Sequence, residues 1–191
     1  ENLGQRNFFS NILPFEALRS AGNERFSDKT VNEIVKACVE MGKVKTGALI
    51  VVERKQSLAE YERTGIDVDA IVTSQLLINI FEHNTPLHDG AIIIRGDRVI
   101  SATCYLPLSD NRELSKDLGT RHRAGVGISE ETDSLTIIVS EETGKISVAQ
   151  EGKLYRGLTA DELRERMTSI QDKVVEDKKR IIWKGRSKNE E

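Results

Sequence analysis

Two spacings of apolar residues alternate along this 191-residue chain, one typical of helices and one typical of buried strands. The first helix is predicted between Ser27, which can cap it, and Gly42. Its apolar side chains share one face: Val31, Ile34, Val35, Cys38 and Val39. Residues 47–54 (GALIVVER) then carry apolar side chains at consecutive positions. This run predicts a strand that is buried on both faces and lies in the middle of a sheet.

The alternation continues toward the C-terminus. Thr73 is expected to cap a second helix whose buried face holds four apolar residues: Leu76, Leu77, Ile80 and Phe81. Between these elements, residues 57–69 are interpreted as polar connecting sequence. Further strands are predicted at 91–95, 98–105, 135–140, 145–150 and 153–155, and a capping box at 159–162 (TADE) predicts a last helix. The pattern therefore indicates an α/β fold with a single mixed sheet.

Three segments follow from this pattern. Residues 1–25 hold a short helical candidate (7–19) interrupted by Pro14, residues 26–170 form the folded domain, and residues 171–191 form a charged helix that frays into a tail. The chain contains no internal repeat.

Composition limits the kinds of partner. With 28 basic and 31 acidic residues the net charge is -3, which argues against a sequence-independent grip on a nucleic-acid backbone. Cys38 and Cys104 lie in apolar surroundings without Cys-x-x-Cys spacing, so we expect two reduced core residues without chemistry. No run of about eighteen apolar residues appears.

The first chemical candidate is the stretch PLHDGA, in which His88, Asp89, Gly90 and Ala91 come directly before a buried strand. A carboxylate at a strand end can bind a divalent ion or accept a proton from a hydroxyl, and a following glycine lets backbone N–H groups approach a phosphate. Taken alone, the same residues are ordinary turn chemistry.

Two further stretches carry polar groups suited to phosphate. GTRHRAG (119–125) offers a hydroxyl and positive charge at a helix start, where the helix dipole favours an anion. SEETG (140–144) follows a buried strand, a position at which open α/β sheets often bind ligands. Taken alone, GTRHRAG can be a solvated basic helix start, although the helix dipole disfavours basic residues there, and SEETG can be an ordinary polar loop. Together with PLHDGA they indicate nucleotide chemistry, and the glycine patterns of P-loop and Rossmann sites are absent.

These motifs, with GALIVVER, resemble the diadenylate cyclase domain, most closely its membrane-anchored bacterial members. The resemblance covers about residues 26–158 in order and spacing. It implies a twisted mixed β-sheet flanked by helices. It also implies condensation of two ATP molecules into cyclic di-AMP with release of two pyrophosphates, assisted by Mn²⁺, Mg²⁺ or Co²⁺.

The resemblance also assigns roles to residues. Asp89 would handle the ribose 3′-hydroxyl, and the backbone of Gly90 and Ala91 would approach the nucleotide. Contacts to adenine would come from Leu49, Tyr105 and Leu106. The triphosphate would be held by Thr120, Arg121, His122 and Arg123. Phosphate and metal would be contacted by Ser140, Glu141 and Glu142, and His88 would be a metal ligand. Asp89 and Glu142 would join His88 at the metal.

One copy of each motif implies one ATP per chain, so catalysis is expected to need a face-to-face homodimer. The chain starts without methionine, and we expect a removed N-terminal membrane anchor. The full-length protein would then lie at the cell membrane with a cytoplasmic catalytic domain, and this fragment would be soluble. Regulatory protein partners stay open. Two alternative functions also stay open: a metal-dependent nucleotide phosphohydrolase and a non-catalytic adenine-nucleotide sensor.

Overall fold

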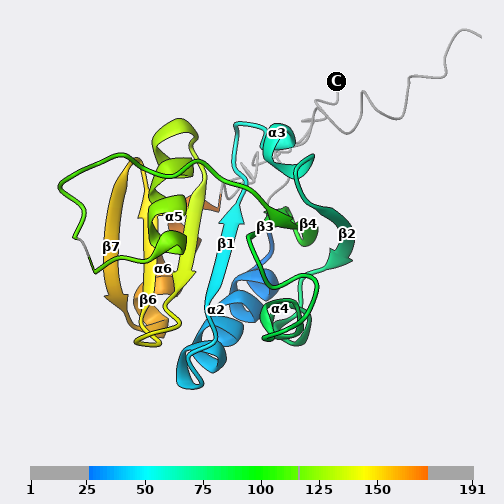
Figure 1. The fold of residues 1–191 in the computed structure, drawn as a ribbon. Helices are drawn as coiled ribbons and strands as arrows, with labels where there is room; N and C mark the ends of the chain where they lie inside the picture. Colours follow the sequence, from blue (N-terminus) through cyan, green and yellow to red (C-terminus); the bar gives the residue numbers. More distant parts are fainter. Residues whose placement is uncertain (1–25, 116, 172–191) are drawn as a thin grey trace, which may run out of the picture.

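A seven-stranded mixed sheet organises the computed structural model of the protein, which describes residues 26–115 and 117–171 (Figure 1). The strand order is β2-β4-β3-β1-β5-β6-β7. The strands are β1 (Ala48–Val52), β2 (Ile66–Ile71), β3 (Ala91–Arg95), β4 (Arg98–Cys104), β5 (Leu135–Val139), β6 (Ile146–Gln150) and β7 (Lys153–Leu158). Only the β1–β3 pairing is parallel, and the other neighbours run antiparallel. The expected single mixed sheet is confirmed.

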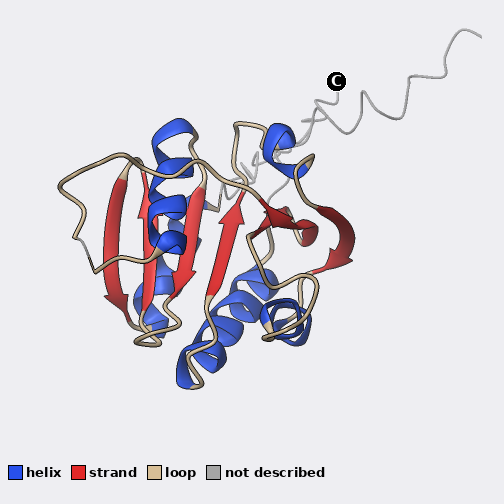
Figure 2. Ribbon diagram, in the orientation of Figure 1, coloured by secondary structure: helices blue, strands red, loops and turns tan. Residues whose placement is uncertain are grey.

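Five helices cover the two faces of this sheet in the described part of the chain (Figure 2). They are α2 (Asp28–Lys43), α3 (Ala59–Glu62), α4 (Ser74–Phe81), α5 (Thr120–Glu131) and α6 (Ala160–Ile170). Alternate residues of β1 explain the two layers, because Ile50 packs in the core beneath α2, α4 and α6, whereas Leu49 packs in the core beneath α5. All five β1 residues are buried, so the predicted central strand is confirmed.

The predicted helix starts are also confirmed. The hydroxyl of Ser27 accepts a hydrogen bond from the Thr30 amide at 3.3 Å, and that of Thr73 accepts one from the Leu76 amide at 3.2 Å. Thr159 and Glu162 form both halves of the predicted capping box. Each cap satisfies backbone donors that the first helical turn leaves without partners.

Residues 57–69 depart from the sequence prediction, because they contain α3 and most of β2 instead of connecting sequence. β2 is the edge strand and pairs antiparallel with β4, with Ile66 opposite Ala102. Its two acidic residues, Asp67 and Asp69, are exposed, and charge is tolerated on an edge strand. The helix predicted at 7–19 lies outside the described residues, as does nearly all of the charged segment 171–191.

The fold brings several chain ends to one edge of the sheet. β1 and β3 begin there, while β5 ends there, since Ala48 pairs with Val139 and Ile50 pairs with Ile92. The first turn of α5 lies over the same edge. Loops that are far apart in the sequence therefore meet at this place. Among the helices of residues 26–115 and 117–171, none combines the length and apolar character that a membrane crossing requires.

Candidate nucleotide-binding site

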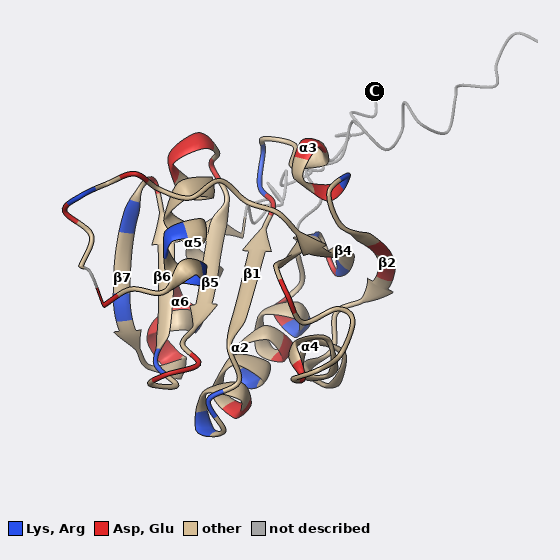
Figure 3. Cartoon of the chain, in the orientation of Figure 1, with Lys and Arg blue, Asp and Glu red and all other residues tan. Residues whose placement is uncertain are grey.

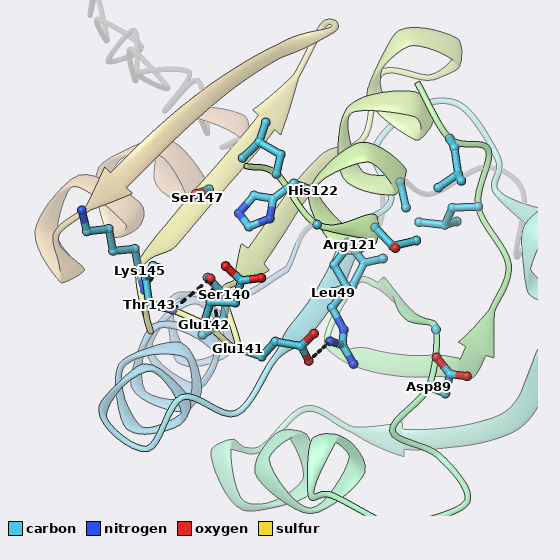
Figure 4. A pocket seen from close by; sticks show the side chains of 18 of the residues that line it. Leu49, Asp89, Arg121, His122, Ser140, Glu141, Glu142, Thr143, Lys145 and Ser147 are labelled. Carbon is cyan, nitrogen blue, oxygen red and sulfur yellow. Dashed lines mark hydrogen bonds and ion pairs between the residues drawn. The ribbon is translucent and has the colours of Figure 1, made fainter. Parts of the chain in front are cut away.

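A cavity of about 610 Å³ opens at this edge, beneath the start of α5 (Figure 4). Its walls come from the α5 start, the loop after β5, the turn before β3 and the end of β4. The lining includes Leu49, Asp89, Gly90, Tyr105, Leu106, Thr120, Arg121, His122, Ser140, Glu141 and Glu142. The three motifs that suggested nucleotide chemistry thus contribute to one cavity of a size usual for small-molecule sites.

The start of α5 presents positive groups to the cavity. The helix begins at Thr120, within the predicted stretch 119–125, with Gly119 as an N-cap that offers no side-chain hydrogen bond. No side chain caps the first amides of α5, and no acidic residue lies in its first turn. The positive end of the helix dipole is therefore not offset by side chains of that turn. Figure 3 shows basic residues on α5 and acidic residues in the nearby β5–β6 loop. This arrangement is suited to an anion.

Close packing holds α5 in place. A Cβ atom added at Gly127 would lie 2.1 Å from the Pro107 carbonyl oxygen, so only glycine allows the helix to approach the loop after β4 this closely. The amide of Ser109 in that loop donates to the Arg123 carbonyl oxygen at 3.0 Å. The loop and the helix start therefore form one unit.

Arg121 and Glu141 form an ion pair across the cavity (Figure 4). Glu141 belongs to a tight turn in which the Ser140 hydroxyl accepts hydrogen bonds from the amides of Glu142, at 3.3 Å, and Thr143, at 3.2 Å. This turn presents two adjacent carboxylates beside the helix start. A phosphate that binds Arg121 has to share it with Glu141 or displace it.

His122 lines the cavity but is only 8% exposed. Burial and the positive charge of Arg156 lower the pKa of its imidazole, while Glu142 and Asp117 act in the opposite direction. His122 is therefore a neutral side chain at neutral pH, so the positive charge at this helix start belongs to the arginines.

Asp89 is exposed and lies across the cavity from Glu142 (Figure 4). The next residue, Gly90, has φ +104°, and a Cβ atom there would lie 2.9 Å from the Thr103 carbonyl carbon. A side chain at position 90 would be strained and also crowded. The glycine thus lets the Asp89 turn rest directly on the end of β4.

Three of the predicted site residues do not line the cavity. Ala91 is completely buried in β3, and Arg123 contributes its carbonyl group to the loop contact. His88 lies outside the wall, with Nδ1 2.6 Å from the Thr85 carbonyl oxygen. Since a carbonyl can only accept, Nδ1 carries a proton, and Nε2 is the ring nitrogen that this contact leaves unused.

The cavity also includes polar residues that lie outside the three motifs: Asp117, Lys145, Ser147 and Arg156. Arg156 donates to Asp117 at 3.2 Å. The two residues are 39 positions apart, and Arg156 lies in a strand whose sequence shows no recognisable site pattern. Only the pairing of β6 with β7 brings it to the site.

The donor set suits a hard divalent ion only in part. Asp89 and Glu142 supply cavity-lining carboxylates, which Mg²⁺ and Mn²⁺ prefer. The Nδ1–H group of His88 donates to the Thr85 carbonyl oxygen. Metal-binding histidines usually make such a contact with the ring nitrogen that does not bind the metal. However, within residues 26–115 and 117–171 no three His, Cys, Asp or Glu side chains are grouped closely enough to hold a metal. One chain by itself therefore offers an incomplete set of ligands.

Comparison with known proteins agrees with the motifs. Residues 35–154 match the DAC family, described as DisA bacterial checkpoint controller nucleotide-binding. Cyclic di-AMP synthase CdaA of Bacillus subtilis (strain 168) is 48% identical over 188 residues, which cover 97% of this chain and 66% of that protein. The chain thus spans slightly less than two thirds of that relative's length.

Two solved structures are similar throughout the sheet. DacA from Staphylococcus aureus, in a double-mutant form, superposes with a TM-score of 0.74 at 48% identity, covering 76% of this chain and 97% of that one. A protein of Bacillus cereus described as a hypothetical membrane spanning protein gives a TM-score of 0.66 at 42% identity, covering 69% of this chain and 64% of that one.

Proposed function

The chain belongs to the DAC family, and from this premise we propose that it is a diadenylate cyclase, which condenses two ATP molecules into cyclic di-AMP and releases two pyrophosphates. The observation that carries the proposal is the meeting of the Asp89 turn, the α5 start and the Ser140–Glu142 turn in one cavity. Apolar residues at the same cavity, Leu49 and Leu106 with Tyr105, provide a surface for adenine.

The triphosphate would bind at the start of α5. Thr120 offers a hydroxyl, Arg121 offers charged donors, and the N-terminal amides of the helix favour an anion. Ser140 and Glu141 would lie beside the phosphates on the opposite wall. We assign neutral His122 a packing and hydrogen-bonding role, and Arg123 the role of holding the helix start in place.

In the reaction, the ribose 3′-oxygen of one ATP attacks the α-phosphorus of the other, and the bond from that phosphorus to the pyrophosphate oxygen breaks. Asp89 accepts the hydroxyl proton or orients the hydroxyl. Pyrophosphate is a good leaving group once its charge is offset, so the protein mainly supplies positioning and electrostatic stabilisation. This division of labour fits a cavity rich in charged residues.

Asp89 and Glu142, with His88, are the residues that would hold Mn²⁺, Mg²⁺ or Co²⁺. When bound, such an ion supplies positive charge to the phosphates and to the attacking oxygen. Because the described residues group no three such ligands, phosphate oxygens or a second protomer would complete the coordination.

We also propose that catalysis takes place between two protomers, because one chain carries one copy of each site element. A membrane anchor in the full-length protein is a further part of the proposal, supported by the description of the Bacillus cereus relative as membrane spanning.

The test is product analysis by mass spectrometry after incubation of the protein with ATP and Mn²⁺. We expect cyclic di-AMP and pyrophosphate. AMP or ADP as the only product would indicate the phosphohydrolase, and nucleotide-induced thermal stabilisation without any product would indicate the sensor.

The matched variant is Asp89→Asn, which keeps the size of the side chain but removes its charge. Turnover should fall by on the order of a hundredfold or more, while the melting temperature stays near that of the unmodified protein. Near-normal turnover in this variant would rule out the role assigned to Asp89.

A further inference from the structure

Arg156 is a cationic residue of the cavity to which no motif assigns a role. It lies on β7, the strand at the end of the sheet opposite β2, and its Nη2 atom is 3.2 Å from Oδ2 of Asp117. Both residues line the cavity that holds Thr120 and Arg121. Since the pair faces the site, its two charges act on whatever anion binds there.

The cations of this cavity are largely neutralised by carboxylates. Arg121 pairs with Glu141 and Arg156 pairs with Asp117, while Lys145 forms no ion pair within residues 26–115 and 117–171. A triphosphate brings several negative charges into the same space. Lys145 and the helix amides meet only part of that charge, so phosphate competes with the carboxylates for the two arginines.

The Arg156–Asp117 pair is well suited to such an exchange. Its side chains are 49% and 61% exposed, whereas that of Arg121 is only 22% exposed. Exposed ion pairs contribute little to stability. Phosphate can accept two parallel hydrogen bonds from a guanidinium group and carries more charge than a carboxylate. Replacement of Asp117 by phosphate is thus favoured at little cost to the fold.

The position of Arg156 agrees with the side of the cavity toward which the leaving pyrophosphate would point. Its charge reaches His122 in the first turn of α5, so it lies beside the helix start that would hold the phosphates. Asp89 lies on the other side of the cavity (Figure 4). In an in-line displacement the leaving pyrophosphate points away from the attacking oxygen. Lys145 lies on the far wall (Figure 4), and Arg156 pairs in the sheet with Ser147, two residues after Lys145. The leaving pyrophosphate would extend toward this wall.

We infer that Arg156 binds the β- or γ-phosphate of ATP and gives up Asp117 in doing so. The inference rests on the proposed function for the orientation of the substrate. Its test, however, measures binding and needs no turnover.

The experiment is calorimetric titration of the whole chain with AMP and with α,β-methylene ATP, an analogue that cannot lose pyrophosphate, both in the presence of Mg²⁺. Arg156→Ala should weaken binding of the analogue by roughly tenfold or more, since a charge-assisted contact is lost, and should leave AMP binding within about twofold. Arg156→Lys should give an intermediate loss. Asp117→Asn should leave binding of the analogue unchanged or make it tighter, because a competing carboxylate has been removed.

Arg98→Ala is the matched control. Arg98 also forms an exposed ion pair with an aspartate, Asp69, at 2.7 Å, but it does not line the cavity. This variant should bind both nucleotides normally.

Opposite effects of Arg156→Ala and Asp117→Asn would support the inference. If both variants lost affinity equally for both nucleotides, the pair would only maintain the fold. Unchanged binding of the analogue by Arg156→Ala would also overturn the inference. If Arg156→Ala does not fold, Arg156→Lys and Asp117→Asn decide by the same criterion. A chain that binds the analogue as expected but makes no cyclic product would refute the proposed function alone.

Discussion

His122 shows how one side chain in the site depends on its surroundings. It follows Arg121 in the first turn of α5, yet its ring is nearly buried and its pKa is lowered, first by desolvation and then by Arg156. A neutral ring beside two arginines keeps the local positive charge from rising further. Protonation of this ring would add a charge in a place where it is poorly solvated.

The pH dependence of stability follows from this pKa. Unfolded His122 takes up a proton near the ordinary value of 6.5, whereas the folded protein takes it up only at lower pH. The contribution of His122 to stability is thus complete above that value and is lost as pH falls through it toward the folded pKa. Urea unfolding at about pH 7.5 and at about pH 5.5 should show a smaller free energy of unfolding at the lower pH.

His122→Asn is the control for this effect and should reduce the difference between the two pH values. Carboxylates with a lowered pKa, such as Glu33 and Asp97, titrate below this range. An equal pH dependence in the variant and the unmodified protein would contradict the assignment.

At the scale of the elements, the segment that joins α3 to β2 contacts the cavity wall at the end of β4. The amide of Tyr105, at the cavity wall, donates to the Thr64 hydroxyl at 2.9 Å, and this hydroxyl donates to the Tyr61 carbonyl oxygen at 2.6 Å. An ion pair between Glu62 and Arg95 attaches α3 to β3. The segment between α3 and β2 therefore determines where the end of β4 lies.

Replacement of Thr64 tests this support. Thr64→Val keeps the shape but removes both hydrogen bonds, each worth roughly 0.5–1.5 kcal/mol, so the Tyr105 backbone should become less well positioned. We expect KM for ATP to rise severalfold with a smaller change in kcat. Thr64→Ser retains the hydroxyl and should restore KM. Equal changes in both variants would show that the methyl group, and not the hydrogen bonds, matters.

At the scale of the whole molecule, the number of nucleotide sites in one chain decides whether two protomers are needed. In the described part of the chain, one Asp89 turn and one α5 start line the same cavity, whereas the proposed product joins two nucleotides. Asp89 is exposed, as the proposed two-protomer arrangement requires if it is to act on a nucleotide held by a second protomer. Two copies related by a two-fold axis would present equivalent half-sites to each other.

Dilution tests the two-protomer arrangement. Cyclic di-AMP formed per protomer, at saturating ATP and Mn²⁺, should rise with protein concentration and level off when dimers dominate. Light scattering on the same samples gives the oligomeric state. Constant activity per protomer in samples shown to be monomeric would require a second ATP site within one chain.

The sequence by itself determined the central strand, four of the five described helices and the hairpins, because periodicity and caps depend on residues a few positions apart. It also identified half of the cavity lining through three short motifs. It failed for β2, where alternation of Ile66, Asp67 and Val68 was a strand signal that the acidic residues obscured.

The tertiary structure decided which of these residues meet. The strand order brings Asp89, Thr120 and Ser140 to one edge of the sheet, and the pairing of β7 adds Arg156 opposite Asp117. The close approach of α5 to the loop after β4 buries His122 and sets its charge state. Ion pairs, burial and pKa values depend on distances through space between residues far apart in the chain, so no local pattern in the sequence contains them.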